Sequence, residues 1–419
     1  MPSRTRSAAS RKAIFDPVHG PIALDPLALA LIGTPEFQRL WGIRQTGFAH
    51  LVFPGANHTR LEHSLGTYWV ASRFVDHLGL AAEEGRRLTT GALLHDLGHG
   101  PFSHTLDPPM REVLGHGHET VSRRLIEGGP TETGTGSVAA LLRRHGVDPR
   151  AVANLVDPAP SARPGWLGGI LHGAIDADRI DYLQRDAHYT GVAHGAIDAV
   201  RLLDTVRLLS GHLVFAEKGR SAVEGFLVGR ALMYSTVYFH KTVRAAEMMA
   251  QAAAERQPGY PESARPMFGW TDGEFLVRLA DAGGLTGALV RAISERRLYK
   301  RAFGWRELDH AARERWRRLA RRPEARRALE DEMAARLRAP AGAVLVDLAG
   351  VEVRGDPAED WADVGLTAGR RVTYPFRGTG AWHALVHRPP ADWPVSVYVA
   401  PRFRAAAARW LERDPRGLP

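Results

Sequence analysis

The sequence contains no cysteine among its 419 residues. Disulfides, thiolate-bound zinc and cysteine nucleophiles are therefore excluded, so any bound metal must be held by histidine and carboxylate side chains. The chain also lacks a run of about 18 uninterrupted apolar residues, which a membrane-spanning helix requires, and an apolar N-terminal stretch typical of a secretory signal. We therefore expect a protein that contacts no membrane and lies in the cytoplasm.

Acidic residues are fewer than basic ones, which gives the chain a formal net charge of +9. A positive charge suits an anionic substrate or nucleic acid. Much of the excess lies between positions 296 and 338, however, and a bias of composition toward arginine and alanine explains it as well. The charge alone therefore assigns no partner.

Helical periodicity dominates the sequence, and strand-like alternation is scarce in its first three quarters. Helices are expected at 26–33, 35–45, 61–79, 85–98, 116–127, 137–145, 166–172, 176–187, 198–209, 221–254, 271–282, 285–294 and 305–338. Short strands or a hairpin are expected at 47–55 and 212–215. Apolar and β-branched runs at 342–353 and 393–401, with a helix at about 402–413, indicate a mixed C-terminal part. The predicted fold is mainly α, an all-helical core with a smaller α+β C-terminal appendage.

Four segments are expected along the chain. Residues 1–13 are small, basic and poor in apolar side chains, which is typical of a disordered lead-in. The main helical domain is expected at 14–257. Proline and glycine then mark a connection to a helical extension at 258–340, and the α+β subdomain is expected at 341–419.

Histidine and aspartate are concentrated in ALLHDLGHGPFSHTLD, residues 92–107. His95 and Asp96 are neighbours near the end of an apolar helix, so their side chains diverge by roughly 100° and can straddle one ion. A third histidine lies four residues beyond His95 on the same face. Glycine and proline then break the helix, and the turn can bring His104 and Asp107 back over the same spot.

Two other helical segments carry polar side chains at suitable spacings. In HTRLEHSLG, Arg60 and His63 lie three residues apart and share a helical face, which places a cation beside a ligand nitrogen. In IDADRIDYLQRD, Asp178, Tyr182 and Arg185 recur along one face. A stripe of this kind is not one that packs into an apolar core.

A fourth segment, GRALMYSTVYFHK, places Arg230, Tyr234, Tyr238 and Lys241 along one side of a predicted helix. Arginine and lysine are the usual partners of phosphate, and tyrosine rings can close over a sugar or a base. Tyrosines that simply pack by their rings explain the spacing equally well. The segment therefore supports a binding site only together with the other three.

In order, these motifs resemble the HD phosphohydrolase superfamily, whose metal ligands follow the pattern H…HD…D. The matches DPVHGPIAL, TPEFQRL, VFPGANHTRLEHSLG, LLHDLGHGPFSH, DADRIDY and VYFHK extend over roughly 14–241. They are similar to the deoxynucleoside triphosphate (dNTP) triphosphohydrolase branch, which includes a nucleotide-activated mammalian enzyme and bacterial relatives. The resemblance implies that residues 14–257 form an HD-domain core and that a metal-dependent enzyme hydrolyses a phosphate ester of a nucleotide.

The resemblance also implies roles for individual residues. The implied metal ligands are His63, His95, Asp96 and Asp178. The implied set for proton transfer and phosphate orientation is His99, His104, Asp107 and His118. The implied substrate-binding residues are Gln45, Thr46, Arg60, Arg179, Tyr182, Asp186, Arg230, Tyr234, Tyr238 and Lys241. Two histidines and two carboxylates suit one divalent transition metal, Fe, Mn, Zn or Ni, and Mg²⁺ is a candidate second ion bound through phosphate.

The sequence departs from the pattern of this branch at four positions. Gly33 and Trp41 stand where the mammalian enzyme carries an acidic residue and an arginine, so a guanine-reading activator site is not expected. Thr46 replaces a common leucine, and Tyr234 stands where histidine is frequent. Both lie in the implied substrate pocket, so the base and the number of phosphates removed stay open.

Three functions fit these observations. The favoured one is a dNTP triphosphohydrolase that releases deoxynucleoside and triphosphate. The second is a phosphatase of nucleoside monophosphates or of a modified biosynthetic nucleotide, for which inorganic phosphate is the product. The third, suggested by the basic segment 296–338, is a non-enzymatic nucleic-acid-binding or regulatory HD protein, for which binding would be steeply salt-dependent. The expected partners are a small-molecule nucleotide and, from the resemblance, other copies of the chain in a dimer or tetramer; nucleic acid is less favoured.

Overall fold

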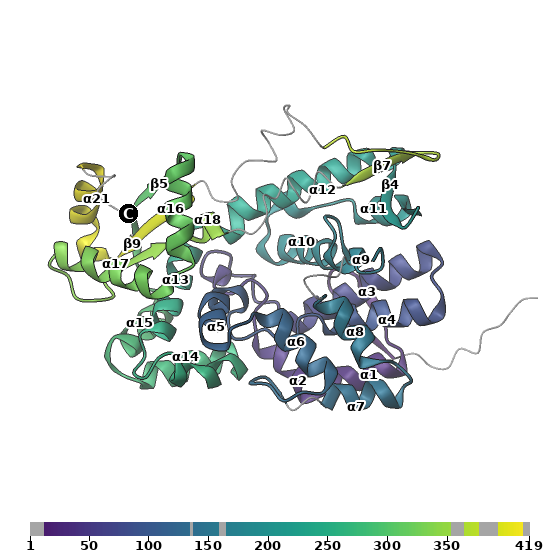
Figure 1. The fold of residues 1–419 in the computed structure, drawn as a ribbon, viewed down its shortest axis with the longest axis horizontal. Coiled ribbons are helices and arrows are strands. Elements are labelled where there is room, and N and C mark those ends of the chain that lie inside the picture. Colours follow the sequence, from purple (N-terminus) through teal and green to yellow (C-terminus); the bar gives the residue numbers. More distant parts are fainter. Residues whose placement is uncertain (1–11, 135–136, 159–164, 353–363, 377–392, 414–419) are drawn as a thin grey trace, which may run out of the picture.

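The computed structural model describes residues 12–134, 137–158, 165–352, 364–376 and 393–413. Figure 1 shows a large helical body that carries most of the chain and a smaller part built around strands near the C-terminus. This arrangement confirms the predicted mainly helical core with a smaller α+β portion. Among the described residues, no helix has the length and apolar character needed to cross a bilayer. The predicted lead-in lies almost entirely outside the described residues.

The N-terminal half begins with an antiparallel hairpin of β1 (Ala13–Asp16) and β2 (Gly20–Ala23). The helices that follow are α1 (Pro26–Ile32), α2 (Pro35–Gln38), α3 (Arg60–Leu78), α4 (Ala82–Leu94), α5 (Asp107–Leu114), α6 (His118–Glu127), α7 (Ser137–Arg144), α8 (Pro149–Val156), α9 (Gly169–His172) and α10 (Ala177–Thr190). Short 3-10 turns occur at Arg39–Gly42, Ala49–Leu51 and Ser103–Leu106. A capping box between Thr59 and Glu62 starts α3, which supplies side chains to the site described below.

The middle of the chain contains the remaining helices of the helical body and the first two strands of a second sheet. Its elements are a 3-10 turn (Ala193–Gly195), α11 (Ala199–Thr205), β3 (Val206–Leu209), β4 (His212–Ala216), a 3-10 turn (Glu217–Gly219), α12 (Arg220–Met233), a π-helical turn (Tyr234–Tyr238), α13 (Lys241–Glu255), a 3-10 helix (Glu262–Gly269), α14 (Asp272–Asp281) and α15 (Gly284–Ser294). The buried face of α13 is lined mostly by alanine and methionine and packs against α15.

The C-terminal part contributes to two sheets. Its elements are β5 (Lys300–Trp305), α16 (His310–Ala320), α17 (Pro323–Arg336), β6 (Val344–Asp347), α18 (Ala349–Glu352), β7 (Gly365–Ala368), β8 (Arg371–Thr373), β9 (Val395–Val399), a 3-10 turn (Pro401–Phe403) and α21 (Arg404–Arg413). Strand β9 lies between β5 and β6 and is antiparallel to both. Strand β7 returns to the helical body and pairs in parallel with β4. The predicted segments 14–257 and 258–340 therefore each share a sheet with the C-terminal segment, through β4–β7 and β5–β9.

Several predicted elements differ from those observed. Residues 47–55 are not strands, because Gly47 has a left-handed φ of 53° that turns the chain and a 3-10 turn follows. The helix expected at 198–209 ends at Thr205, because Val206 begins the pairing of β3 with β4. The strand expected at 212–215 is confirmed by β4.

The two longest predicted helices are both interrupted. The helix expected at 221–254 breaks into α12, the π-helical turn and α13, with His240 as the N-cap of α13. The segment 305–338 holds two helices, because the chain turns at 321–322 and Pro323 starts α17. Residues 342–353 form β6 followed by α18, and 393–401 contain β9.

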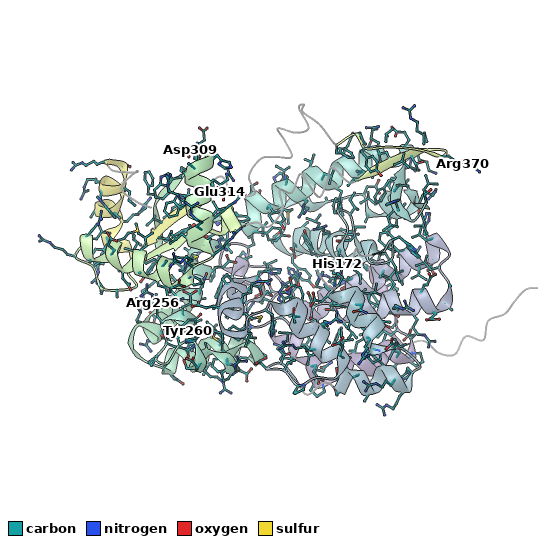
Figure 2. The ribbon with its side chains drawn as sticks, viewed as in Figure 1. His172, Arg256, Tyr260, Asp309, Glu314 and Arg370 are labelled. Carbon is teal, nitrogen blue, oxygen red and sulfur yellow. The ribbon has the colours of Figure 1, made fainter. Side chains whose placement is uncertain are left out.

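Buried ion pairs attach α17 to α13. Arg326 donates to Glu255 of α13 and, at 2.7 Å, to Glu330 in the next turn of its own helix. Arg256, labelled in Figure 2, is the C-cap of α13 and donates to Glu330 at 3.1 Å. Glu330 is completely buried and Arg326 is 5% exposed. Each of these buried charged groups is therefore stabilised by its oppositely charged partners.

Arg326→Ala should lower the free energy of unfolding by about 3–5 kcal/mol, because it leaves buried carboxylates without their cation. Arg336→Ala is a matched control in the same helix, where Arg336 pairs with the exposed Glu332 at the same i,i+4 spacing. That exposed pair should contribute about 0–1 kcal/mol. Urea denaturation of both variants measures the difference, and equal losses would contradict the assignment.

Candidate metal centre and neighbouring histidine cluster

Side chains from three helical segments converge where the sequence predicted a metal. His63 lies on α3, His95 and Asp96 follow α4, and Asp178 lies in the first turn of α10. His63 Nε2 lies 2.9 Å from Asp178 Oδ1 and 3.6 Å from Asp96 Oδ2. His95 Nε2 lies 3.3 Å from Asp96 Oδ1 and 3.7 Å from Asp178 Oδ1. We call these four side chains the metal cluster.

Ligand atoms of His63, His95 and Asp178 all lie within 4.8 Å of one another, and Asp96 places one oxygen near each histidine, so these separations fit ligands around one divalent ion. Bonds of about 2.0–2.2 Å from nitrogen and oxygen ligands, at angles near 90–109°, place neighbouring donor atoms about 3–3.5 Å apart. The Nε2 atoms of His63 and His95 are also buried without a hydrogen-bond partner among the described residues. Buried polar atoms are rarely left in this state unless another group satisfies them. The donor set therefore fits a divalent metal.

The electrostatics of the metal cluster favour positive charge. Burial opposes the charged form of His63, but the nearby carboxylates of Asp178 and Asp181 outweigh it and raise the pKa of His63 to about 10. Burial likewise opposes the charge of His95, yet Asp96 raises its pKa. For Asp178, burial is outweighed by His63 and His95, which lower the pKa of this carboxyl. Without a cation, the carboxylates retain a proton on the imidazoles instead.

Metal binding should therefore release protons at neutral pH. An ion must displace the proton that His63 holds up to about pH 10, so the apparent Kd should fall about tenfold for each pH unit between pH 7 and 9. Calorimetric titration with Mn²⁺ in buffers of different ionisation enthalpy measures the number of protons released. An affinity that is independent of pH, with no proton release, would contradict this description of the site.

A second cluster lies directly beside the first. Ligand atoms of His99, His104, Asp107 and His118 all lie within 4.8 Å of one another. His118 Nδ1 lies 3.1 Å from Asp107 Oδ1, and His104 Nδ1 lies 2.9 Å from Asp107 Oδ2. His99 stacks on the ring of His118 and places its Nε2 3.3 Å from Asp96 Oδ1. We call these four residues the histidine cluster, and His99 joins it to the metal cluster.

The pKa values of the two buried histidines of this cluster are shifted in opposite directions by their surroundings. Burial and the nearby Arg60 guanidinium hold the pKa of His99 well below its usual range. Burial also disfavours charge on His118, but Asp107 outweighs it and raises the pKa of His118. Paired titratable groups with separated pKa values are the usual arrangement for acid–base work. Positive charge is therefore favoured on His118 and disfavoured on His99.

A strained turn positions the histidine cluster. Phe102 and Ser103 both have a φ of 54°, which side chains other than glycine adopt at a cost of about 1–3 kcal/mol. Asp272 accepts a hydrogen bond from the Phe102 N–H at 2.7 Å, and Arg60 Nε donates to Ser103 Oγ at 2.8 Å. Arg39 is half-buried and donates to the carbonyl of His99 at 2.6 Å. Long-range contacts therefore hold this turn in place.

The structure places the predicted substrate-binding residues in different environments. Arg60 is buried, and its Nη1 donates to Asp96 Oδ2 at 2.6 Å, so a cation lies directly beside the metal cluster. The Tyr182 and Tyr238 rings lie 6.3 Å apart, and the Tyr238 hydroxyl donates to Asp186. Gln45 Oε1 is buried without a hydrogen-bond partner in the described part of the chain.

The remaining predicted residues are placed as follows. Tyr234 lies 5.1 Å from the Tyr238 ring, and the Arg230 guanidinium lies over Tyr234. Arg179 donates to the carbonyl of Gly173, and Lys241 is exposed in the first turn of α13.

Thr46 Oγ1 is buried and unpartnered within the described ranges. Arg185 was predicted to lie on a polar helical face outside the core, and this prediction is wrong. Its side chain is fully buried and donates hydrogen bonds to Asp181 and Asp16. Charge pairing inside the core decides its position.

Sequence reasoning missed the side chains that support these clusters. His58 Nε2 lies 2.7 Å from Asp186 Oδ1. The Asp181 carboxylate forms hydrogen bonds with both His63 and His19. Asp181 could have been suspected, because it lies one helical turn after Asp178. His19 lies in the DPVHGPIAL motif, but no local pattern pairs it with Asp181, which lies 162 residues further along the chain.

Comparison with known families agrees with this geometry. Residues 60–186 match the HD domain family, and residues 197–361 match the HD associated region. The chain therefore carries an HD domain at residues 60–186. The identification made from the motifs is thereby confirmed, including the resemblance to the dNTP triphosphohydrolase branch.

Several curated proteins are similar in sequence. The chain is 37% identical to an uncharacterized protein of Methanocaldococcus jannaschii over 59% of this chain and 50% of that one. It is 40% identical to the uncharacterized protein YwfO of Bacillus subtilis over 58% and 54%. It is 34% identical to human deoxynucleoside triphosphate triphosphohydrolase SAMHD1 over 43% and 33%. The matches thus span about half or less of the length of these relatives.

Two solved structures share the fold over nearly their whole length. A hypothetical protein from Aquifex aeolicus superposes with a TM-score of 0.70 and 25% identity, covering 96% of this chain and 100% of that one. A phosphohydrolase from Bacteroides thetaiotaomicron gives a TM-score of 0.70 and 24% identity, covering 93% and 99%. The HD match and the metal cluster together support a metal-dependent phosphohydrolase.

Proposed function

We propose that this HD-domain protein is a metal-dependent phosphohydrolase that acts on dNTPs and releases deoxynucleoside and triphosphate. The observation that carries the proposal is the junction of the two clusters, where His99 Nε2 lies 3.3 Å from Asp96 Oδ1. A metal-ligand set and an acid–base set therefore face one reaction site. Relatives from human, chicken and Dictyostelium discoideum whose names specify dNTP triphosphohydrolase or its homologue support the substrate class.

The chemistry assigned to the site uses both clusters. His63, His95, Asp96 and Asp178 would hold a divalent ion, which when bound polarises a phosphoryl oxygen and lowers the pKa of a bound water. Arg60 adds positive charge beside Asp96 and would stabilise charge on the phosphate. Water oxygen forms a bond to the α-phosphorus and releases one proton to solvent, the bond from phosphorus to the 5′ oxygen breaks, and that oxygen takes a proton in turn. His118, whose pKa Asp107 raises, supplies this proton.

The deoxyribose would lie against the pair of tyrosines. Asp186 accepts from the Tyr238 hydroxyl and from His58 at 2.7 Å. A carboxylate offers about four lone-pair sites, so Asp186 retains acceptor capacity for a sugar hydroxyl. Arg179, Arg230 and Lys241 are proposed as partners of the phosphates because arginine and lysine are the usual phosphate ligands.

A phosphatase of nucleoside monophosphates is the second candidate. Thr46 favours this candidate, because it stands where the dNTP-hydrolysing branch commonly has leucine. Its hydroxyl is buried and has no hydrogen-bond partner among the described residues. Tyr234 also departs from that branch and contacts Tyr238. Both changes alter the proposed substrate pocket and leave the metal cluster intact.

Product analysis tests the proposal. Purified protein is incubated with Mn²⁺, Mg²⁺, Fe²⁺ or Co²⁺ and each dNTP, NTP and nucleoside monophosphate. Tripolyphosphate with free deoxynucleoside is the expected result, and inorganic phosphate from monophosphates would favour the second candidate. Steeply salt-dependent binding to nucleic acid with no turnover would favour the regulatory reading. A cytoplasmic location and a homodimer or homotetramer are also proposed, and light scattering tests the latter.

A further inference from the structure

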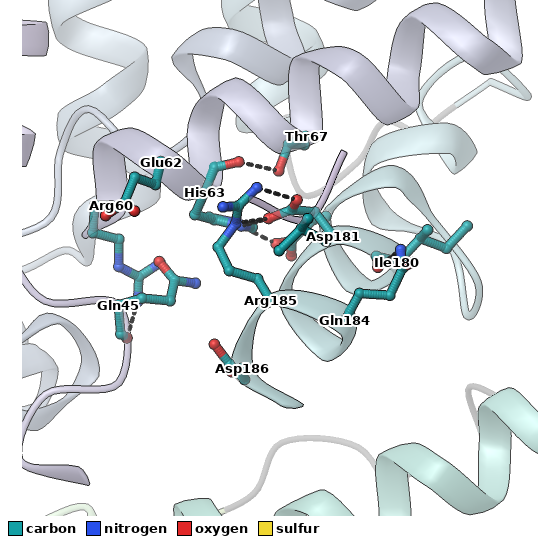
Figure 3. Close-up of polar contacts among 12 residues, drawn as sticks. Gln45, Arg60, Glu62, His63, Thr67, Ile180, Asp181, Gln184, Arg185 and Asp186 are labelled. Carbon is teal, nitrogen blue, oxygen red and sulfur yellow. Dashed lines mark hydrogen bonds and ion pairs between the residues drawn. The ribbon is translucent and has the colours of Figure 1, made fainter. Parts of the chain in front are cut away.

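The orientation of His63 depends on its second ring nitrogen. His63 faces the metal cluster through Nε2, while Nδ1 lies 2.7 Å from Asp181 Oδ2. Both side chains are completely buried. Metal-binding histidines commonly donate their other N–H to a carboxylate, which fixes the ring and its tautomer. Asp181 occupies that position for His63 (Figure 3).

Asp181 is itself held on both of its oxygens. Arg185, one turn further along α10, donates from Nε to Oδ2 and from Nη2 to Oδ1, each at 2.9 Å. His19 Nε2 lies 2.6 Å from Oδ1. The paired contact with Arg185 fixes the plane of the carboxylate, and the contact with His19 ties it to another part of the chain.

Those outer contacts come from the turn of the β1–β2 hairpin. Arg185 Nη1 donates to Asp16 Oδ2 at 2.7 Å, and Asp16 Oδ1 accepts from the backbone N–H groups of Val18 and His19. The His19 ring stacks on Trp69 of α3, with ring centroids 4.4 Å apart. The hairpin turn is therefore packed between α3 and α10, the two helices that carry His63 and Asp178.

Gly66 provides the space for this network. A Cβ atom at position 66 would lie 1.8 Å from Asp181 Oδ1 and 2.4 Å from Arg185 Nη2. Any larger residue would push the carboxylate away from His63. Gly225, also inside a helix, has nothing within 4 Å of the corresponding position.

We propose that the β1–β2 hairpin, which lies outside the HD-domain match, is a working part of the metal centre. Asp16 and His19 act as positioning residues: they hold the Asp181–Arg185 pair, and Asp181 orients His63 with Nε2 facing the ion. The inference rests on the metal site of the proposed function. It extends the functional unit from residues 60–186 back to residue 16.

The test measures Co²⁺ affinity and the visible spectrum of the Co²⁺-loaded full chain. His19→Phe retains a ring to stack on Trp69 but removes the hydrogen bond to Asp181, and it should weaken Co²⁺ binding about tenfold and alter the spectrum. His19→Gln, which can still donate, should recover most of the affinity. Gly66→Ala should weaken binding about 10–100-fold, whereas Gly225→Ala, the matched helical control, should not.

The outcomes separate this inference from the proposed function. Wild-type protein that takes up no metal would overturn both. Wild-type protein that binds Co²⁺ while folded His19→Phe and Gly66→Ala bind it equally well would overturn only the role of the hairpin. Should His19→Phe fail to fold, as judged by circular dichroism, the comparison of Gly66→Ala with Gly225→Ala decides.

Discussion

Replacing His95 with alanine should lower kcat for nucleotide hydrolysis at least about 1,000-fold and reduce the metal content of the protein. Stabilisation of charge by a metal contributes several kcal/mol to the transition state, and about 4 kcal/mol corresponds to three decades in rate. His95 is suited to the test because its Nδ1 contacts only the Ala92 carbonyl among the described residues, at 2.8 Å. Turnover rates and elemental analysis of the purified variant measure both effects.

The choice of ligand matters for the folding of the variant. Asp96→Ala would leave the buried Arg60 without the carboxylate that it contacts at 2.6 Å, and removing one partner of a buried pair costs about 3–5 kcal/mol. Asp96→Asn keeps the size of the side chain and is preferable. His77→Ala, at the far end of α3, is the control for loss of a histidine. Full activity of metal-free His95→Ala would contradict the metal assignment.

Replacing His118 with alanine should lower kcat by about 10²–10⁴-fold and leave the metal in place. His118 belongs to the histidine cluster, and its donor role depends on the protonated form that Asp107 stabilises. The wild-type rate should therefore fall as pH rises through the raised pKa of His118, because the proton donor is lost, and this limb should be missing from the variant. A pH–rate profile with parallel metal analysis provides the measurement.

The comparison with His104→Ala sharpens this prediction. His104 also contacts Asp107, but its side chain is 68% exposed. Exposure lets water replace the imidazole, so we expect a smaller loss of kcat than for His118→Ala. Equal losses of kcat in the two variants would contradict the assignment of His118 as the proton donor. Loss of metal from His118→Ala would show that the histidine cluster is needed for metal binding and is not a separate site.

The metal cluster could be predicted from the sequence because helical geometry and a specific motif determine it. His95 and Asp96 are adjacent at a helix end, and both face the same point in the structure as expected. The spacing of Arg60 and His63 also holds, since both contact Asp96. The helical class of the fold follows from periodicity in the same way.

Features that depend on distant contacts could not be predicted. Strand β5 lies in the predicted helical extension, between the helices expected at 285–294 and 305–338, and it forms because β9, about 95 residues later, pairs with it. Arg185 has the helical spacing of a polar stripe, yet pairing with Asp16 buries it completely. The contact of His19 with Asp181 likewise has no local pattern, because tertiary packing alone brings them together.

Anomalous diffraction from crystals grown with Mn²⁺ tests the central claim most directly. We predict one strong peak bonded to His63 Nε2, His95 Nε2 and oxygens of Asp96 and Asp178, at about 2.0–2.3 Å from each. The absence of any peak among these four side chains, in a protein that still hydrolyses nucleotides in the presence of a chelator, would contradict it.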